Sequence, residues 1–168
     1  MIRPPSIAAT GLLCALAVGC SGYKSTSPNS TSTYVANMSG ANESPAIATA
    51  ATGMATVRIT GSTITASLQV QNIDSALAAH IHLTSNGSII APLYSGAATG
   101  MGFSGNLGPA SFTVTPVNGV TMDSLLSAIR LGHTYVNVHT SAHPAGEIRG
   151  ALQLQQTQTA GGGGYGYP

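Results

Sequence analysis

Apolar and polar residues alternate along the middle of the chain, which is the pattern of half-buried β-strands. The clearest run lies at residues 63–70, where Thr, Ser and Gln alternate with Ile64, Ala66, Leu68 and Val70. Residues 55–59 repeat the pattern, and the Gly-Ser pair at 61–62 favours a tight hairpin between the two runs. Further strands are predicted at residues 34–38, 78–83, 88–93, 111–115, 134–140 and 147–154.

One segment instead carries apolar residues at helical spacing, Met122, Leu125, Leu126 and Ile129. This pattern predicts a helix over residues 121–131, with Thr121 as its cap and Gly132 after its end. The glycine-rich residues 95–109 are expected to form a long loop. Seven or eight short strands with one crossover helix predict an all-β sandwich or Greek-key barrel. Its core is expected to contain Ile64, Leu68, Val70, Ile81, Val136, Val138, Ile148 and Leu152.

The two ends of the chain differ in composition from this domain, which is expected over residues 34–154. Residues 20–33 are rich in Ser and Thr and contain too few apolar side chains to fold, so they predict a flexible tether after Cys20. Residues 155–168 are of low complexity and contain a run of glycines. We expect this tail to be disordered.

The first residues have the features of an export signal. Arg3 supplies a positive charge, and the apolar run at residues 7–18 is too short to span a bilayer as a permanent helix. The run ends in LAVGC, which resembles the lipobox of bacterial lipoproteins. We therefore expect residues 1–19 to be a signal peptide and Cys20 to carry the lipid that anchors the protein to a membrane. The alternative is an ordinary cleaved signal with an incidental cysteine.

Charge is scarce along the chain and nearly balanced. Apart from Arg3, the basic residues are Lys24, Arg58, Arg130 and Arg149, and the acidic residues are Glu43, Asp74, Asp123 and Glu147. Such a chain offers no basic surface for nucleic acid and no polybasic patch for anionic lipid. We expect a location in the cell envelope, at the outer membrane if the host is Gram-negative, and an envelope or extracellular protein as partner.

Three histidines lie out of phase with the apolar residues of their strands. His80 and His82 are two apart within residues 78–83, so both project from the face opposite the core. His139 is likewise out of phase with the two valines of residues 134–140. If the two strands are neighbours, the three imidazoles can converge on a copper or zinc ion. The alternative is that they only form hydrogen bonds with nearby polar groups.

Four other residues complete the set of candidates. His143 lies in a loop with Pro and Gly and is a candidate fourth metal ligand, whereas His133 follows a helix end and is expected only to favour the helix dipole. Glu147 and Arg149 share a strand face and are expected to form an ion pair or to brace a loop. No set of nucleophile, base and acid is recognisable, so the sequence favours a protein that is not an enzyme.

Several blocks of the sequence resemble the CHRD domain, a family named for chordin and common in bacterial secreted proteins. They are SGANESP, ATAATGMA, AHIH and, near the end, YVNVHT with PAGEIRG. The resemblance implies an immunoglobulin-like Greek-key β-sandwich, similar to that of copper–zinc superoxide dismutase. The chain departs from the family pattern at Leu83 and His143, where the family more often has Gly and Asn. It also lacks the bridging histidine and zinc loop of the dismutase, so we do not expect dismutation.

Three functional interpretations follow from these observations. The leading one is a lipid-anchored exported protein whose β-sandwich binds another protein without catalysis. The second is a copper- or zinc-binding module that uses a surface site of His80, His82 and His139. The third is a redox enzyme at the same metal. The distances between the three imidazoles separate these interpretations, because ring nitrogens more than about 8 Å apart cannot share one ion.

Overall fold

The computed structural model of the chain describes residues 30–158, which form ten strands, one α-helix and one turn of 3-10 helix. One set of strands comprises β1 (Thr31–Ser39), β2 (Thr52–Thr60), β3 (Thr63–Ile73), β6 (Phe103–Asn106) and β7 (Phe112–Thr113). The other comprises β4 (Ala76–Leu83), β5 (Ile89–Ser95), β8 (Thr134–Thr140) and β9 (Ile148–Ala151). The last strand is β10 (Gln153–Gln158).

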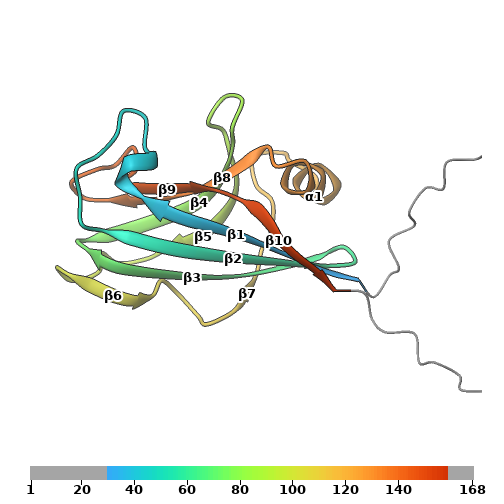
Figure 1. Ribbon diagram of the computed structural model, residues 1–168, viewed down its shortest axis with the longest axis horizontal. Helices are drawn as coiled ribbons and strands as arrows, with labels where there is room; N and C mark the ends of the chain where they lie inside the picture. The colour runs from blue at the N-terminus through green and yellow to red at the C-terminus, as the bar shows by residue number, and fades with distance from the viewer. Residues whose placement is uncertain (1–29, 159–168) are drawn as a thin grey trace, which may run out of the picture.

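The strands form a curled antiparallel sheet whose two halves face each other. Its hydrogen-bonded order is β5-β4-β8-β9-β1-β2-β3-β6, with β7 paired to β3 and β10 paired to β1. Because the sheet curls between β9 and β1, the strands before and after this point form two layers around a shared interior (Figure 1). The prediction of an all-β sandwich is confirmed.

The inward-facing side chains of both layers make one core. Ile64 and Leu68 of β3 are fully buried, as are Ile81 of β4 and Val136 of β8. All eight predicted core residues are buried, the remaining four being Val70, Val138, Ile148 and Leu152. Each buried large aliphatic side chain stabilises the fold by about 1.5–3 kcal/mol, so this shared interior is what holds the two layers together.

The helix α1 (Met122–Arg130) closes one end of the sandwich. Thr121 caps it, because its Oγ1 accepts a hydrogen bond from the Ser124 backbone N–H at 3.1 Å. Gly132 follows the helix with a φ of 72°, which favours glycine. The predicted helix and both of its end signals are therefore confirmed. Its buried residues are Leu125, Leu126 and Ile129.

The strand predicted at residues 147–154 is in fact two strands that meet at a corner. β9 pairs with β8 in one layer, and β10 pairs with β1 in the other. Between them, the Leu152 backbone N–H donates a hydrogen bond to the Thr134 carbonyl at 3.0 Å. β1 and β9 are paired only at Ser39 and Arg149. The Asn42 side chain also bridges the two strands, because its Nδ2 donates to the Asn37 and Arg149 carbonyls, and a pocket lies beside this corner.

The folded domain is wider than the predicted residues 34–154, and one predicted loop contains a strand. Thr31 pairs with Gln158, so residues 31–33 belong to the sheet rather than to the tether, and the first part of the tail is strand β10. Neither segment has the apolar pattern of a strand, and both join the sheet through backbone pairing. Within residues 95–109, β6 pairs with β3 although its Gly and polar residues conceal any alternation.

The predicted signal peptide at residues 1–19, the lipidated Cys20 and most of the tether lie outside the described residues, as do residues 159–168. Lipidation and export therefore stay predictions. Within residues 30–158, no helix is long and apolar enough to cross a membrane.

Candidate metal centre

The three histidines predicted to converge lie together on the outer face of β4 and β8. These strands are neighbours, and the register places His80 opposite Asn137 and His82 opposite Tyr135. One ring nitrogen from each of His80, His82 and His139 lies within 4.8 Å of the others. Their ring centroids are 4.9–5.7 Å apart. The predicted convergence is confirmed, well inside the 8 Å limit.

Backbone carbonyls orient two of the three rings. His82 Nδ1 donates to the Gly87 carbonyl at 2.8 Å, and His139 Nδ1 donates to the Pro144 carbonyl at 2.9 Å. Because a carbonyl only accepts, each Nδ1 carries the proton, and in the neutral ring each Nε2 keeps its lone pair. Metal-binding histidines are commonly held by this kind of outward N–H bond.

Of the two Nε2 lone pairs, that of His139 has a hydrogen-bond partner and that of His82 has none within residues 30–158. His139 Nε2 lies 3.0 Å from His80 Nδ1, and since the His139 atom is the acceptor, His80 is the donor. His82 Nε2 is buried and has no hydrogen-bond partner among residues 30–158. A buried lone pair without a partner is costly, so this atom is the part of the cluster that most requires a further ligand.

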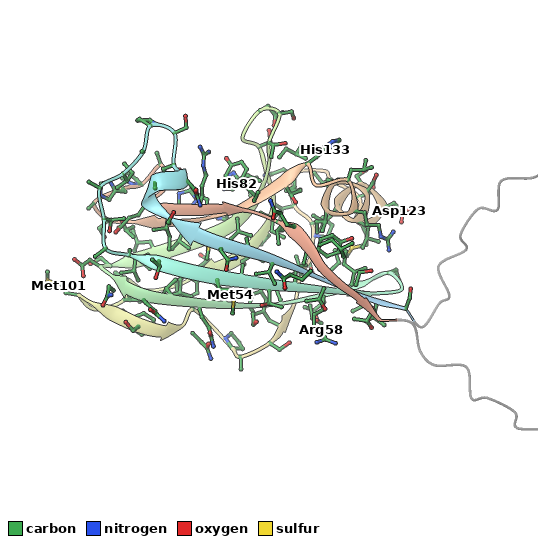
Figure 2. The ribbon with its side chains drawn as sticks, in the orientation of Figure 1. Met54, Arg58, His82, Met101, Asp123 and His133 are labelled. Carbon is green, nitrogen blue, oxygen red and sulfur yellow. The ribbon has the colours of Figure 1, made fainter. Side chains whose placement is uncertain are left out.

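The cluster is partly buried at the surface of the sheet, because His80 and His139 are half-buried and His82 is buried. His82 is only 6% exposed and lies on the opposite layer from Met54 and Arg58 (Figure 2). Burial, together with the smaller effects of the neighbouring His139 and His82, lowers the pKa of His80 to about 4. Burial also lowers the pKa of His82, against the opposing effect of the Gly87 hydrogen bond. Both rings are therefore neutral at pH 7, the form that binds metals.

A stack of three side chains covers one side of the cluster. The Tyr135 ring lies parallel to the His82 imidazole, with centroids 5.0 Å apart and an interplanar angle of 9°. Arg149 of β9 places its Cζ 5.1 Å from the centre of the same tyrosine ring. Because β8 lies between β4 and β9, the histidine and the arginine approach Tyr135 from opposite sides. The stack restricts the orientation of the His82 ring.

The loop after β1 folds over the same face and is tied to it by Glu43. Glu43 Oε1 accepts a hydrogen bond from Asn137 Nδ2 at 2.9 Å, and its Oε2 lies 3.5 Å from Arg149 Nε. Arg149 Nε also donates to the Asn42 carbonyl at 2.6 Å. Burial raises the pKa of Glu43, while Arg149 acts in the opposite direction. Asn137 is consequently only 3% exposed although it lies on the outer face.

A family model described as the CHRD domain matches residues 34–152. The chain belongs to the CHRD domain family. No curated protein and no solved structure shows a significant match to it. The blocks that resemble this family are far apart in sequence, but the fold brings several of them together at this face. Glu43 comes from the first block, His80 and His82 from the third, and His139 and Arg149 from the last.

Glu147 and Arg149 do not form the predicted ion pair. Glu147 is 6% exposed, and its two oxygens accept hydrogen bonds from Thr49 Oγ1 at 2.7 Å and Thr140 Oγ1 at 2.8 Å. Arg149 pairs with Glu43 instead. Residues two apart on one chain share a face, but here the loop after β1 supplies nearer partners to each. The two residues brace this loop of the CHRD domain independently.

The other two histidines lie outside the cluster. The backbone N–H of His143 donates to Thr140 Oγ1 and its carbonyl accepts from the Gly146 N–H, so this residue forms the turn before β9. Among residues 30–158, the structure does not bring its side chain into the group formed by the other three histidines, so a role as fourth ligand stays a prediction. His133 follows the helix and is exposed.

The sequence did not indicate Asn42, Glu43 or Tyr135 as part of the site. Tyr135 is four residues from His139 and so lies on the same strand face, but its contact with His82 depends on the register of β4 against β8. Asn42 and Glu43 belong to a CHRD block, which was the available signal. Membership of this block singles out the two residues, but it does not indicate which strands their loop covers.

Proposed function

We propose that the CHRD domain of this chain is a metal-binding module in which His80, His82 and His139 hold one copper or zinc ion. The observation that carries the proposal is their convergence: three imidazoles from two neighbouring strands lie within 4.8 Å, and backbone carbonyls orient two of them. Imidazole is a good ligand for both metals, and three of them form a common site for zinc.

The distances fit such an ion after small side-chain movements. Metal–nitrogen bonds of about 2.0–2.1 Å in a tetrahedral site place the ligand nitrogens roughly 3.4 Å apart. His80 Nδ1 and His139 Nε2 are already 3.0 Å apart, and the widest separation in the cluster is 4.8 Å. Rotations about side-chain torsions can close the remaining roughly 1.4 Å. The ion would replace the hydrogen bond between His80 and His139, with the proton of the neutral His80 ring carried on Nε2 instead of Nδ1, and would supply His82 Nε2 with a partner.

Three protein ligands leave one position of the ion open. Among residues 30–158, no further His, Cys, Asp or Glu joins the group. Closed structural zinc sites use four protein ligands, whereas an open position allows the ion to be exchanged or to bind a further molecule. The arrangement therefore supports storage, sensing or delivery of the metal. Copper is expected to bind more tightly than zinc, following the usual order of affinities.

Lipid on Cys20 would hold this module at a membrane of the cell envelope. The support for this part of the proposal is the LAVGC sequence after a short apolar run. The Cys20→Ala variant should move the protein from the membrane fraction to the soluble fraction of the host. Retention of this variant in the membrane fraction would contradict lipid anchoring and would leave the metal proposal unaffected.

Metal titration of the purified full chain, made without a histidine tag, tests the central part. We expect one equivalent of Cu²⁺ or Zn²⁺ to bind in competition with a chelator of known affinity. His80→Ala, His82→Ala and His139→Ala should each weaken binding by about 100-fold or more, because each removes a ligand. His133→Ala and His143→Ala are the matched controls and should bind as the wild type does. Absence of stoichiometric binding, or equal losses in the controls, would refute the proposal.

A further inference from the structure

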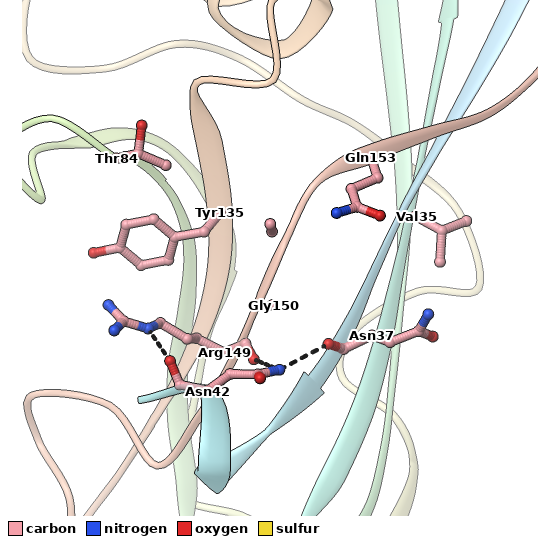
Figure 3. Close-up of a pocket in the computed structure, with 9 residues that line it drawn as sticks. Val35, Asn37, Asn42, Thr84, Tyr135, Arg149, Gly150 and Gln153 are labelled. Carbon is pink, nitrogen blue, oxygen red and sulfur yellow. Dashed lines mark hydrogen bonds between the residues drawn. The ribbon is translucent and has the colours of Figure 1, made fainter. Parts of the chain in front are cut away.

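A polar pocket lies beside the proposed metal site, at the corner between β1, β9 and β10. Its volume is about 520 Å³, which is in the range of small-molecule sites. Figure 3 shows its wall, and the lining includes Asn42, Thr84, Tyr135, Arg149, Ala151 and Gln153. The Tyr135 ring separates this pocket from His82, so the pocket is a neighbour of the metal cluster and not a part of it.

Within the described part of the chain, Arg149 is the one charged residue in the lining of this pocket, and the two terminal nitrogens of its guanidinium are free to bind a ligand. Its Nε is engaged by the Asn42 carbonyl and lies 3.5 Å from Glu43. Its two terminal nitrogens make no hydrogen bond or ion pair with any residue in the range 30–158. The guanidinium packs against Tyr135, and the side chain is only 25% exposed. The structure thus holds a cation in a fixed orientation with its donor pair unused.

We propose that this pocket binds a small organic carboxylate through the two terminal nitrogens of Arg149. The guanidinium fork matches a carboxylate by two parallel hydrogen bonds. A single cation that already has Glu43 nearby suits a ligand with one negative charge better than a phosphate, which carries nearly two. The Thr84 hydroxyl and the Gln153 amide can bond to hydroxyl or amide groups on the rest of the ligand.

A second pocket provides an internal contrast. It lies on the outer face of β2 and β3, has a volume of about 690 Å³, and is lined by uncharged side chains such as Thr52, Gln69 and Gln71. Size and polarity are therefore not what distinguishes the pocket at Arg149. The distinguishing feature is an oriented cation with free donors, and the proposal holds whether or not the histidines bind a metal.

The test is a titration of the metal-free, ¹⁵N-labelled full chain followed by NMR, with lactate as the probe. Lactate should cause saturable shifts of the backbone amides around the pocket, at Asn42, Tyr135, Ala151 and Gln153. Lactamide, its neutral analogue, should cause none, and inorganic phosphate should bind at least several-fold more weakly. Phosphate binding as tight as lactate binding would refute the assignment to carboxylates.

Two variants and one control locate the binding. Arg149→Gln should weaken lactate binding at least tenfold. Because Arg149 also supports the loop at Asn42, Ala151→Phe provides an independent variant that fills the pocket and keeps the arginine, and it should abolish the shifts. Arg58→Gln, on the other layer, should bind lactate as the wild type does. Lactate binding that survives in both Arg149→Gln and Ala151→Phe, or that never saturates, would overturn the proposal.

Discussion

The outer faces of the two layers arise from the same alternation of inward and outward residues, but their outward side chains differ in burial. On β2 and β3, the outward residues Arg58, Gln69 and Gln71 are exposed. On β4 and β8, the outward residues His82 and Asn137 are buried. The first face makes few side-chain hydrogen bonds, whereas the second is connected to the loop after β1 and to the turn before β9.

The difference lies in what folds over each face. The loop after β1, with its turn of 3-10 helix, and the turn at residues 141–147 approach the ends of β4, β8 and β9 (Figure 1). Polar side chains that are covered in this way must find hydrogen-bond partners, and the partners fix their orientation. An oriented set of imidazoles is what a metal site needs, so the covered face and not the exposed one carries the proposed function.

Substitution of Gly146 is expected to have the largest effect on stability, because it disrupts the packing over the covered face of β4 and β8. Its φ of 133° disfavours any side chain, and a Cβ would collide with the Asn137 amide and the Glu43 carboxylate. We expect Gly146→Ala to lower the free energy of unfolding by about 2–5 kcal/mol in urea titrations. Gly119→Ala is the matched control, because Gly119 has a φ of 75° but open space around it. Equal losses in the two variants would show that contact with Asn137 and Glu43 is unimportant.

The pH dependence of stability should also distinguish the faces. The pKa of His80 is about 4 in the folded chain, against the ordinary histidine value of 6.5 that applies to the unfolded chain. As the pH falls below 6.5, the unfolded chain binds a proton that folded His80 does not, so the free energy of unfolding falls until about pH 4. His82 acts in the same direction. Urea titrations of the metal-free chain should therefore show a shallower decline for His80→Gln than for wild type.

His133→Gln is the control for that experiment, since His133 is exposed and outside the cluster. Its stability should decline with falling pH as steeply as that of the wild type. If His80→Gln and His133→Gln gave the same slope as the wild type, burial of the cluster would not be what depresses the pKa of His80.

The smallest effect is expected from the stack on His82. Tyr135→Leu removes the parallel ring and should weaken metal binding by about two- to tenfold, the value of a lost aromatic contact. Tyr135→Phe keeps the ring and should stay within about twofold of wild type by the same measure. Gln71→Ala, on the exposed face, should leave metal affinity unchanged. A Tyr135→Leu variant with wild-type affinity would show that the stack does not orient the ligand.

The alternation of inward and outward residues along the strands predicts the core and the face on which the three histidines lie. Ile81 and Val136 point inward because they are apolar, which forces His80 and His139 to the other face. That inference needs only the period of a strand and the assumption that β4 and β8 are neighbours. The helix was equally predictable, since Thr121 and Gly132 act locally on the backbone at its ends.

Interactions between distant segments could not be predicted in this way. The shared strand face of Glu147 and Arg149 predicts that they form an ion pair or brace a loop, but their partners Thr49 and Glu43 come from a loop about a hundred residues earlier. Nothing in a strand pattern reports which loop covers it. β6 and residues 31–33 of β1 show no apolar alternation from which a strand could be predicted, and their place in the sheet is set by pairing with distant strands.

X-ray absorption spectroscopy of the full chain loaded with one equivalent of copper or zinc tests the central claim most directly. The account predicts about three imidazole nitrogens at about 2.0 Å from the ion. The imidazole signal should fall by about one ligand in His139→Ala and stay unchanged in His133→Ala. A spectrum without imidazole scattering, or one that does not change in His139→Ala, would contradict a metal site at His80, His82 and His139.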